Sequence, residues 1–206
     1  MFLYLSAAKY NLQFHLLPQL AAAIGLLIFT PVLFGITALD TRTAALPLEL
    51  SLPFLGVILL TPVYSPEQES GLLDTVRARK TPHLFICGLR IMMAAAMTVL
   101  FICGFVLIMS ALECEVTANH ALASCANAIF LGGLGILASS ASGHAVIGYL
   151  LPVAYYVLDL LGGLSCFTMF SMIRSGTMDG KWIIFVIGLG CIAASLWCRH
   201  LRLGRK

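Results

Sequence analysis

Long apolar stretches alternate with short polar segments along the chain. Each stretch is long enough to cross, or nearly cross, about 30 Å of hydrocarbon as an α-helix. We therefore predict an all-α, polytopic membrane protein with six transmembrane helices. The six stretches are Leu16–Ala38, Leu46–Val63, Leu84–Ser110, Ala121–Ser140, His144–Leu161 and Trp182–Trp197.

The second apolar stretch is the least regular, because Pro47, Pro53 and Pro62 lie in it. A proline frees backbone groups that lipid cannot satisfy, so neighbouring helices or water must satisfy them. This pattern favours a packed bundle over isolated helices.

The fifth stretch runs on beyond the length that one span needs, and Gly162-Gly163 interrupts it. We predict a span over 144–161, followed by a short re-entrant helix over 164–174 that dips back from the outer face. Its backbone should be buried against protein, because exposed non-helical backbone is costly in lipid. The alternative is one long tilted helix through both segments.

Small residues recur along the fourth stretch and should let another helix approach closely. They are Gly132, Gly133, Gly135, Ser139 and Gly143.

The N-terminal segment has helical apolar spacing with polar residues elsewhere, so residues 1–15 are predicted to form an interfacial helix. The alternative is the first half of a long first span. We expect no cleaved signal peptide, because Lys9 comes late and no cleavage pattern precedes a soluble domain.

The composition is 60% hydrophobic and 10% charged, whereas soluble domains average about 25% charged residues. The spans leave no room for a separate soluble catalytic domain of about 100 residues. We therefore expect one transmembrane domain over 1–206 that is not an enzyme. Energy for any transport would come from another subunit.

The basic residues cluster at predicted membrane boundaries, which indicates orientation rather than nucleic-acid binding. Of the twelve Lys and Arg, nine fall on one side and three on the other. The nine are Lys9, Arg77, Arg79, Lys80, Arg90, Arg199, Arg202, Arg205 and Lys206; the three are Arg42, Arg174 and Lys181. Both termini are thus predicted to be cytoplasmic, which an even number of spans also requires, and the protein to lie in the plasma membrane.

A charge-ordered segment, residues 65–82, joins the second and third spans. Ser65 suits the N-cap of a helix, with Pro66 at its first position, and Pro82 ends the segment. Acidic residues fill its first turn and basic residues its last, as the helix dipole favours. We predict a cytoplasmic helix with a narrow apolar stripe that docks on a soluble protein; the alternative is a solvated loop helix.

Cys114 and Cys125 flank a short loop on the predicted outer side. A disulfide between them is one interpretation, because that side is oxidising. Together with Glu113 and His120 they could instead bind a metal, although the spacing matches no standard site.

We take Asp159 as the one acid well inside a span, on a helix that also carries Tyr155 and Tyr156. Carboxylates within a membrane usually face a cavity or a partner. Asp159 is therefore either a polar point on a substrate pathway or a packing or interfacial acid. The segment Gly176–Lys181 lacks the spacing of a phosphate-binding loop, so no bound cofactor is expected.

These features together resemble the ABC-2 family of transporter permeases. The residues that carry the resemblance most directly are Glu67, Glu69, Gly71, Leu72, Leu73 and Pro82, which are similar to the family's acidic residues, glycine, apolar pair and proline before the third span. The architectural likeness covers nearly the whole chain, and the sequence likeness about residues 65–95. The chain lacks the sizeable outer domain of larger members.

The resemblance implies a permease that pairs with a second permease subunit and with separate ATPase subunits, which bind ATP and Mg. The coupling helix, residues 65–82, would dock on an ATPase through Glu67, Glu69, Leu72, Leu73, Val76 and Arg77. The second and fifth spans would line the pathway, with Phe54, Tyr155, Tyr156 and Asp159 as candidate residues. Export of a peptide, antibiotic or lipid-like molecule is expected.

Two other functions remain open. A non-transporting scaffold or assembly factor would use 65–82 for docking without an ATPase. A secondary transporter is the other alternative. We find only one embedded carboxylate and no paired broken helices, which argues against it.

The remaining segments complete the layout of the domain. Spans one and two lie in 16–63, spans three to six lie in 84–197, and 198–206 forms a basic cytoplasmic tail.

Overall fold

The computed structural model describes residues 17–67, 83–162, 168–178 and 180–204. Within these ranges all regular secondary structure is helical. The helices are α2 (Leu17–Phe34), α3 (Thr41–Leu50), α4 (Pro53–Leu60), the 3₁₀ helix η2 (Thr61–Glu67), α6 (His83–Ala111), α7 (Ala118–Ser142), α8 (Ala145–Leu160), α9 (Ser171–Ser175) and α10 (Lys181–Gly204). The prediction of an all-α chain is confirmed for this part.

Five helical segments in the described part are long and apolar enough to cross a membrane. They are Leu17–Phe34, Thr41–Ser65, Cys87–Ala111, Ala118–Ser142 and Lys181–Arg199. The predicted fifth span forms α8, which is apolar but only 16 residues long. At 1.5 Å per residue this helix reaches about 24 Å, which is shorter than the hydrocarbon core.

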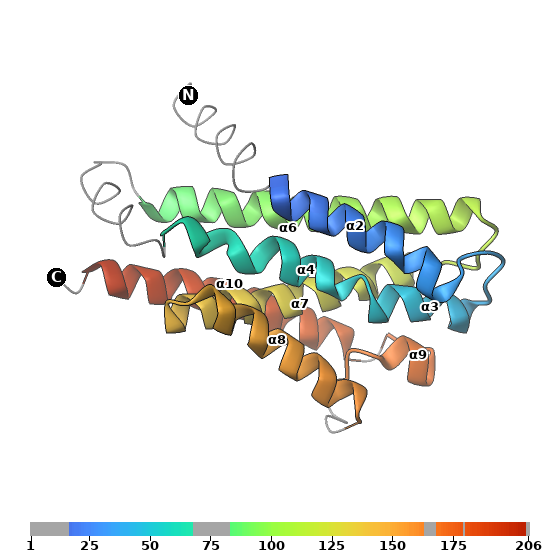
Figure 1. Cartoon of the computed structure of the whole chain (residues 1–206). Helices are drawn as coiled ribbons and strands as arrows, with labels where there is room; N and C mark the ends of the chain where they lie inside the picture. Colours follow the sequence, from blue (N-terminus) through green and yellow to red (C-terminus); the bar gives the residue numbers. More distant parts are fainter. Residues whose placement is uncertain (1–16, 68–82, 163–167, 179, 205–206) are drawn as a thin grey trace.

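The long helices run alternately in opposite directions (Figure 1). One end of the bundle carries the connections at 35–40 and 112–117, the end of α8, the beginning of α10, and α9; we call it the α9 end. The end of η2, the beginning of α6 and the end of α10 share the opposite end. The segment between η2 and α6 therefore leaves and re-enters the bundle at the same end.

The second span is irregular, as its prolines indicated: α3 and α4 are separated by Ser51 and Leu52, which keep helical dihedral angles. It begins at Thr41 rather than Leu46, because Asp40 is the N-cap and Pro47 is accommodated inside α3. The helix α3 stops at Leu50, and Pro53 begins α4 at a position where its missing N–H costs nothing. This extension places more of the chain inside the bundle than the apolar pattern indicated.

Close backbone approach explains how the mostly buried helix α7 packs against its neighbours. A Cβ added to Gly56 of α4 would lie 1.8 Å from the carbonyl oxygen of Ala128 in α7. A Cβ on Gly133 of α7 would lie 2.6 Å from the carbonyl oxygen of Gly188 in α10. The prediction that small residues of the fourth span permit close packing is confirmed.

Two other glycines of the same pattern have different roles. Gly135 approaches Gly148 of α8, where an added Cβ would lie 3.0 Å from a carbonyl oxygen. Gly143 does not line a helix contact; it ends α7 with a φ of 80° in the left-handed region that glycine favours.

The predicted break after the fifth span is confirmed, since α8 ends at Leu160 and Gly162 has a φ of 84°. One long helix through both segments is therefore wrong. A short helix follows, but it covers Ser171–Ser175 rather than 164–174. Residues 163–167 lie outside the described part.

The predicted interfacial helix and most of the predicted coupling helix also lie outside the described residues. Ser65 and Pro66 lie inside η2, which continues from α4 without interruption. The prediction that Ser65 caps the beginning of a new helix is therefore wrong, because helical turns already run through it.

Candidate functional site

A buried ion pair joins the second span to the last helix at the α9 end. The Nζ atom of Lys181, the first residue of α10, lies 2.6 Å from Oε1 of Glu49 in α3. Both side chains are 1% exposed. Charged side chains are rarely buried unless they are paired, so each of these two groups requires the other.

The ammonium of Lys181 has two further acceptors. It donates a hydrogen bond of 3.1 Å to Oδ1 of Asn127 in α7 and another to the carbonyl oxygen of Met169. An ammonium carries three donors, and all three are used here. Lys181 is thus fixed by groups from α3, from α7 and from the segment before α9.

The carboxylate of Glu49 also binds the backbone of α9. Its Oε1 accepts from the N–H of Met172 at 3.2 Å, and its Oε2 accepts from the N–H of Ile173 at 3.1 Å. The first N–H groups of a helix have no partners within the helix. Glu49 therefore satisfies two of these donors while pairing with Lys181.

Met169 is bound through both of its backbone polar groups. Its N–H donates to Oδ2 of Asp159 at 2.6 Å. Its carbonyl oxygen accepts from Nδ2 of Asn127 at 2.9 Å and from Lys181. We call Glu49, Asn127, Asp159 and Lys181 the polar cluster; together they bind backbone groups of Met169, Met172 and Ile173.

The polar cluster explains how irregular backbone is stable at this position. Non-helical backbone at membrane depth is tolerated only where protein or water satisfies its polar groups. Here α3, α7, α8 and α10 each contribute one side chain, and Met169 and Phe170 are almost fully buried. The short segment thus packs against protein, as we predicted.

Aromatic rings form a second cluster beside these polar groups. The ring centroids of Phe54 and Tyr156 are 4.7 Å apart, and those of Tyr156 and Phe170 are 5.4 Å apart. Tyr155 packs edge-on against Phe130 at 4.9 Å. These five residues, the aromatic cluster, join α4, α7 and α8 to the segment before α9.

The structure brings the predicted pathway residues together. Phe54, Tyr155 and Tyr156 belong to the aromatic cluster, and Asp159 follows Tyr156 by about one turn of α8. The hydroxyl of Tyr156 donates to the carbonyl oxygen of Leu50 at 3.0 Å, where α3 ends. The second and fifth spans therefore meet at these side chains, and a pathway role for them stays a prediction.

The predicted ATPase-coupling residues are not placed by the structure. Glu67 is the last residue of η2. Glu69, Leu72, Leu73, Val76 and Arg77 lie outside the described residues.

The predicted disulfide between Cys114 and Cys125 is absent, because both residues are free thiols. The thiol of Cys114 donates to the carbonyl oxygen of Ile36 at 3.5 Å and packs into an apolar core. Cys125 lies inside α7. Proximity in sequence across a loop did not bring the two sulfur atoms together.

The alternative metal site at this loop is not formed either. His120 contacts Thr117 and the carbonyl oxygen of Thr41 and completes a capping box at the beginning of α7. In the part of the chain that the structure describes, no three His, Cys, Asp or Glu side chains gather as metal ligands.

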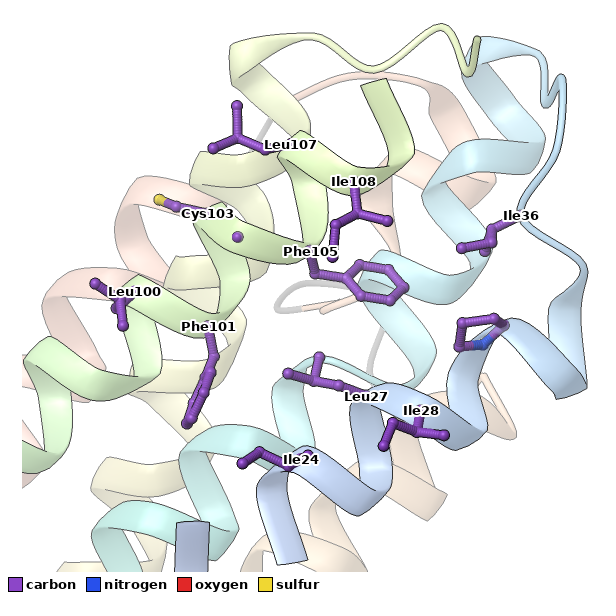
Figure 2. A pocket seen from close by; sticks show the side chains of 12 residues that line it. Ile24, Leu27, Ile28, Ile36, Leu100, Phe101, Cys103, Phe105, Leu107 and Ile108 are labelled. Carbon is purple, nitrogen blue, oxygen red and sulfur yellow. The ribbon is translucent and has the colours of Figure 1, made fainter. Parts of the chain in front are cut away.

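An apolar groove of about 630 Å³ lies between α2 and α6. Figure 2 shows Leu27 and Ile28 of α2 facing Phe101 and Phe105 of α6 across it. Its lining is almost entirely hydrocarbon, so it offers no group for recognition or chemistry. It suits contact with membrane lipid, and the candidate site therefore rests on the polar and aromatic clusters.

Sequence reasoning missed three members of the polar cluster. Glu49 lies inside the predicted second span, so the interpretation of Asp159 as the one embedded acid is wrong. Lys181 was assigned only to orientation, because it directly precedes an apolar stretch, and Asn127 was not singled out. A carboxylate inside an apolar stretch was the signal that could have identified Glu49.

Comparison with models of protein families, with curated proteins and with solved structures finds no match to this chain. The function is therefore argued from the chain's own geometry.

Proposed function

We propose that this chain is the membrane-spanning permease subunit of an ATP-driven exporter of the ABC-2 type. The observation that carries the proposal is that η2 ends, α6 begins and α10 ends at one end of the bundle (Figure 1). The charge-ordered segment 65–82 joins η2 to α6 in the sequence, so its two attachment points lie at that end. A docking segment must lie at one end of the bundle, because a soluble partner reaches a membrane protein only from the side of the membrane on which the partner is found.

The charge distribution supports a cytoplasmic location for that end. The basic residues 77–80 fall in the sequence between η2 and α6, which meet at that end, and Arg199 and Arg202 lie in the last part of α10. Arg174 and Lys181 lie at the α9 end. Cytoplasmic loops carry the excess of Lys and Arg. Both termini would then be cytoplasmic, and a separate ATPase with bound ATP and Mg would dock beneath 65–82.

The irregular second span supports a transport pathway beside α4 and α8. Interrupted helices are common where transporters bind substrates, and Tyr156 of α8 donates to the carbonyl oxygen of Leu50, where α3 ends. Phe54 and Tyr156 would line this path, and the polar cluster closes it at the α9 end in this conformation. A second permease subunit would complete the exporter, and its substrate would be a peptide, an antibiotic or a lipid-like molecule.

The test replaces Leu72 and Leu73 together with Asp. New unpaired charges in a packed contact cost several kcal/mol, which weakens docking by orders of magnitude. Co-purification with a candidate ATPase subunit and substrate-stimulated ATP hydrolysis should both fall sharply. A matched control, Leu112→Asp, puts a charge in the exposed loop at the α9 end and should leave both unchanged. Unchanged docking and stimulation in the double variant would contradict the proposal and favour the scaffold.

A secondary transporter is distinguished by its energy source. Glu49 provides a second buried carboxylate, so the count that argued against this class no longer holds. Glu49 is already neutralised by Lys181, however, and is not an open ion site. If transport persisted without any ATPase and followed an ion gradient, the chain would be a secondary transporter and not an ATP-driven exporter.

A further inference from the structure

One oxygen of the polar cluster has no partner. Asp159 is 0% exposed, and its Oδ2 accepts from Met169. Its Oδ1 makes no hydrogen bond among the residues that the structure describes. A buried carboxylate oxygen without a donor is costly, so it is an acceptor that a nearby cation would occupy.

Lys181 binds the same residue as Asp159. It donates to the carbonyl oxygen of Met169, and the N–H of Met169 donates to Asp159. The four-carbon stem of a lysine is flexible, so a rotation within it can move the ammonium to another acceptor.

Arg174, the other cation beside Asp159, does not donate to the free oxygen of the Asp159 carboxylate. The guanidinium of Arg174 donates to the backbone carbonyl oxygen of Asp159 at 2.9 Å. It therefore fixes the end of α8 to α9 and leaves the carboxylate of Asp159 for another donor.

We propose that Asp159 is a second acceptor for Lys181 and that the ammonium exchanges between Glu49 and Asp159. Paired with Glu49, Lys181 ties α10 to the second span; paired with Asp159, it ties α10 to α8. Only the meaning of this exchange for transport depends on the proposed function. In an exporter it would change which of the two pathway helices is linked to α10.

The exchange predicts that either carboxylate alone can hold the ammonium. The full-length chain in lipid nanodiscs, without any ATPase, is compared as wild type, Glu49→Gln, Asp159→Asn and the double variant. Hydrogen exchange of the peptide that contains Met169, Met172 and Ile173 measures how often the segment opens. We expect the hydrogen-exchange rate of this peptide to be higher in each single variant than in wild type. The rate increase in the double variant should exceed the product of the two single increases by about 3- to 100-fold, the usual range for residues of one network.

The matched control repeats the four proteins with Lys181→Met. Without the ammonium, the excess in the double variant should vanish or reverse, because two buried anions then only repel each other. The proposal would be overturned if, in the proteins that retain Lys181, the rate increase of the double variant only equalled the product of the two single increases. It would also be overturned if the excess persisted in the Lys181→Met proteins, because the coupling would then not depend on the ammonium.

A second comparison applies if the double variant does not fold. If the ammonium moves between the two carboxylates, Glu49→Gln should open the segment around Met169 less than Lys181→Met does, because Asp159 still holds the ammonium. Equal or greater opening in Glu49→Gln would overturn the proposal. None of these measurements involves ATP hydrolysis, so they fail or succeed independently of the exporter assignment.

Discussion

The ammonium of Lys181 lies 2.6 Å from the carboxylate of Glu49, although the two residues are 132 positions apart in the chain. This contact closes the bundle between its second span and its last helix. It also places both charges beside backbone groups that lipid could not satisfy. The stability of the α9 end therefore depends on a pair that forms only in the folded chain.

Removing one member of this pair should be worse than removing both. Lys181→Met leaves a buried, unpaired carboxylate and should lower the free energy of unfolding by about 3–5 kcal/mol. Glu49→Met combined with Lys181→Met leaves neither charge of the pair and should recover part of this loss, although the N–H groups of α9 lose their acceptor. Chemical unfolding in detergent measures the difference. A double variant as unstable as the sum of its single variants would contradict the pairing.

The contact between α4 and α7 should tolerate no side chain at Gly56. Gly56→Ala would place a Cβ 1.8 Å from the carbonyl oxygen of Ala128, so the helices must separate. Overpacking usually costs about 1–3 kcal/mol, and a backbone clash falls at the upper end or beyond. Gly25→Ala in α2 is the control, because nothing lies within 4 Å of its added Cβ. Thermal unfolding in detergent should separate the two variants; equal stability would show that α4 and α7 are not packed in this way.

The two ends of the bundle should face opposite sides of the membrane. A single cysteine at Glu67 or Lys206 of a cysteine-free variant should be labelled by a membrane-impermeant maleimide only after the cells are opened, because these positions belong to the basic end. A cysteine at Glu115, in the loop at the α9 end, should react in intact cells. Labelling of Glu67 from outside would invert the orientation and remove the docking role of 65–82.

The apolar pattern predicted the helices well because each one is defined locally. Prolines at 47, 53 and 62 indicated the irregular second span, and Gly162 indicated the end of α8. These signals act over a few residues, so one sequence is enough to read them. The length of α8 was harder to predict, because the apolar run itself continues past the residue where the helix stops.

The candidate site was only partly predictable. Asp159 and Tyr156 were identified because polar and aromatic groups inside a span are costly or distinctive. Glu49, Asn127 and Lys181 meet through contacts between helices that are distant in sequence, and no local pattern encodes such a meeting. Local sequence also failed to predict that Cys114 and Cys125 are free thiols, because the packing of α6 and α7 decides the distance between them.

The binding of residues 169–173 by four different helices has a consequence for biogenesis. Glu49, Asn127 and Asp159 enter the membrane before Lys181, because Lys181 begins α10, which follows α3, α7 and α8 in the chain. Until α10 inserts, Glu49 is an anion without its cation, and the carbonyl oxygen of Met169 lacks one of its donors. The α9 end therefore cannot mature while the ribosome is still making the earlier helices. A chain truncated before Lys181 should present an incompletely assembled end, which is the kind of feature that membrane quality-control proteases can recognise.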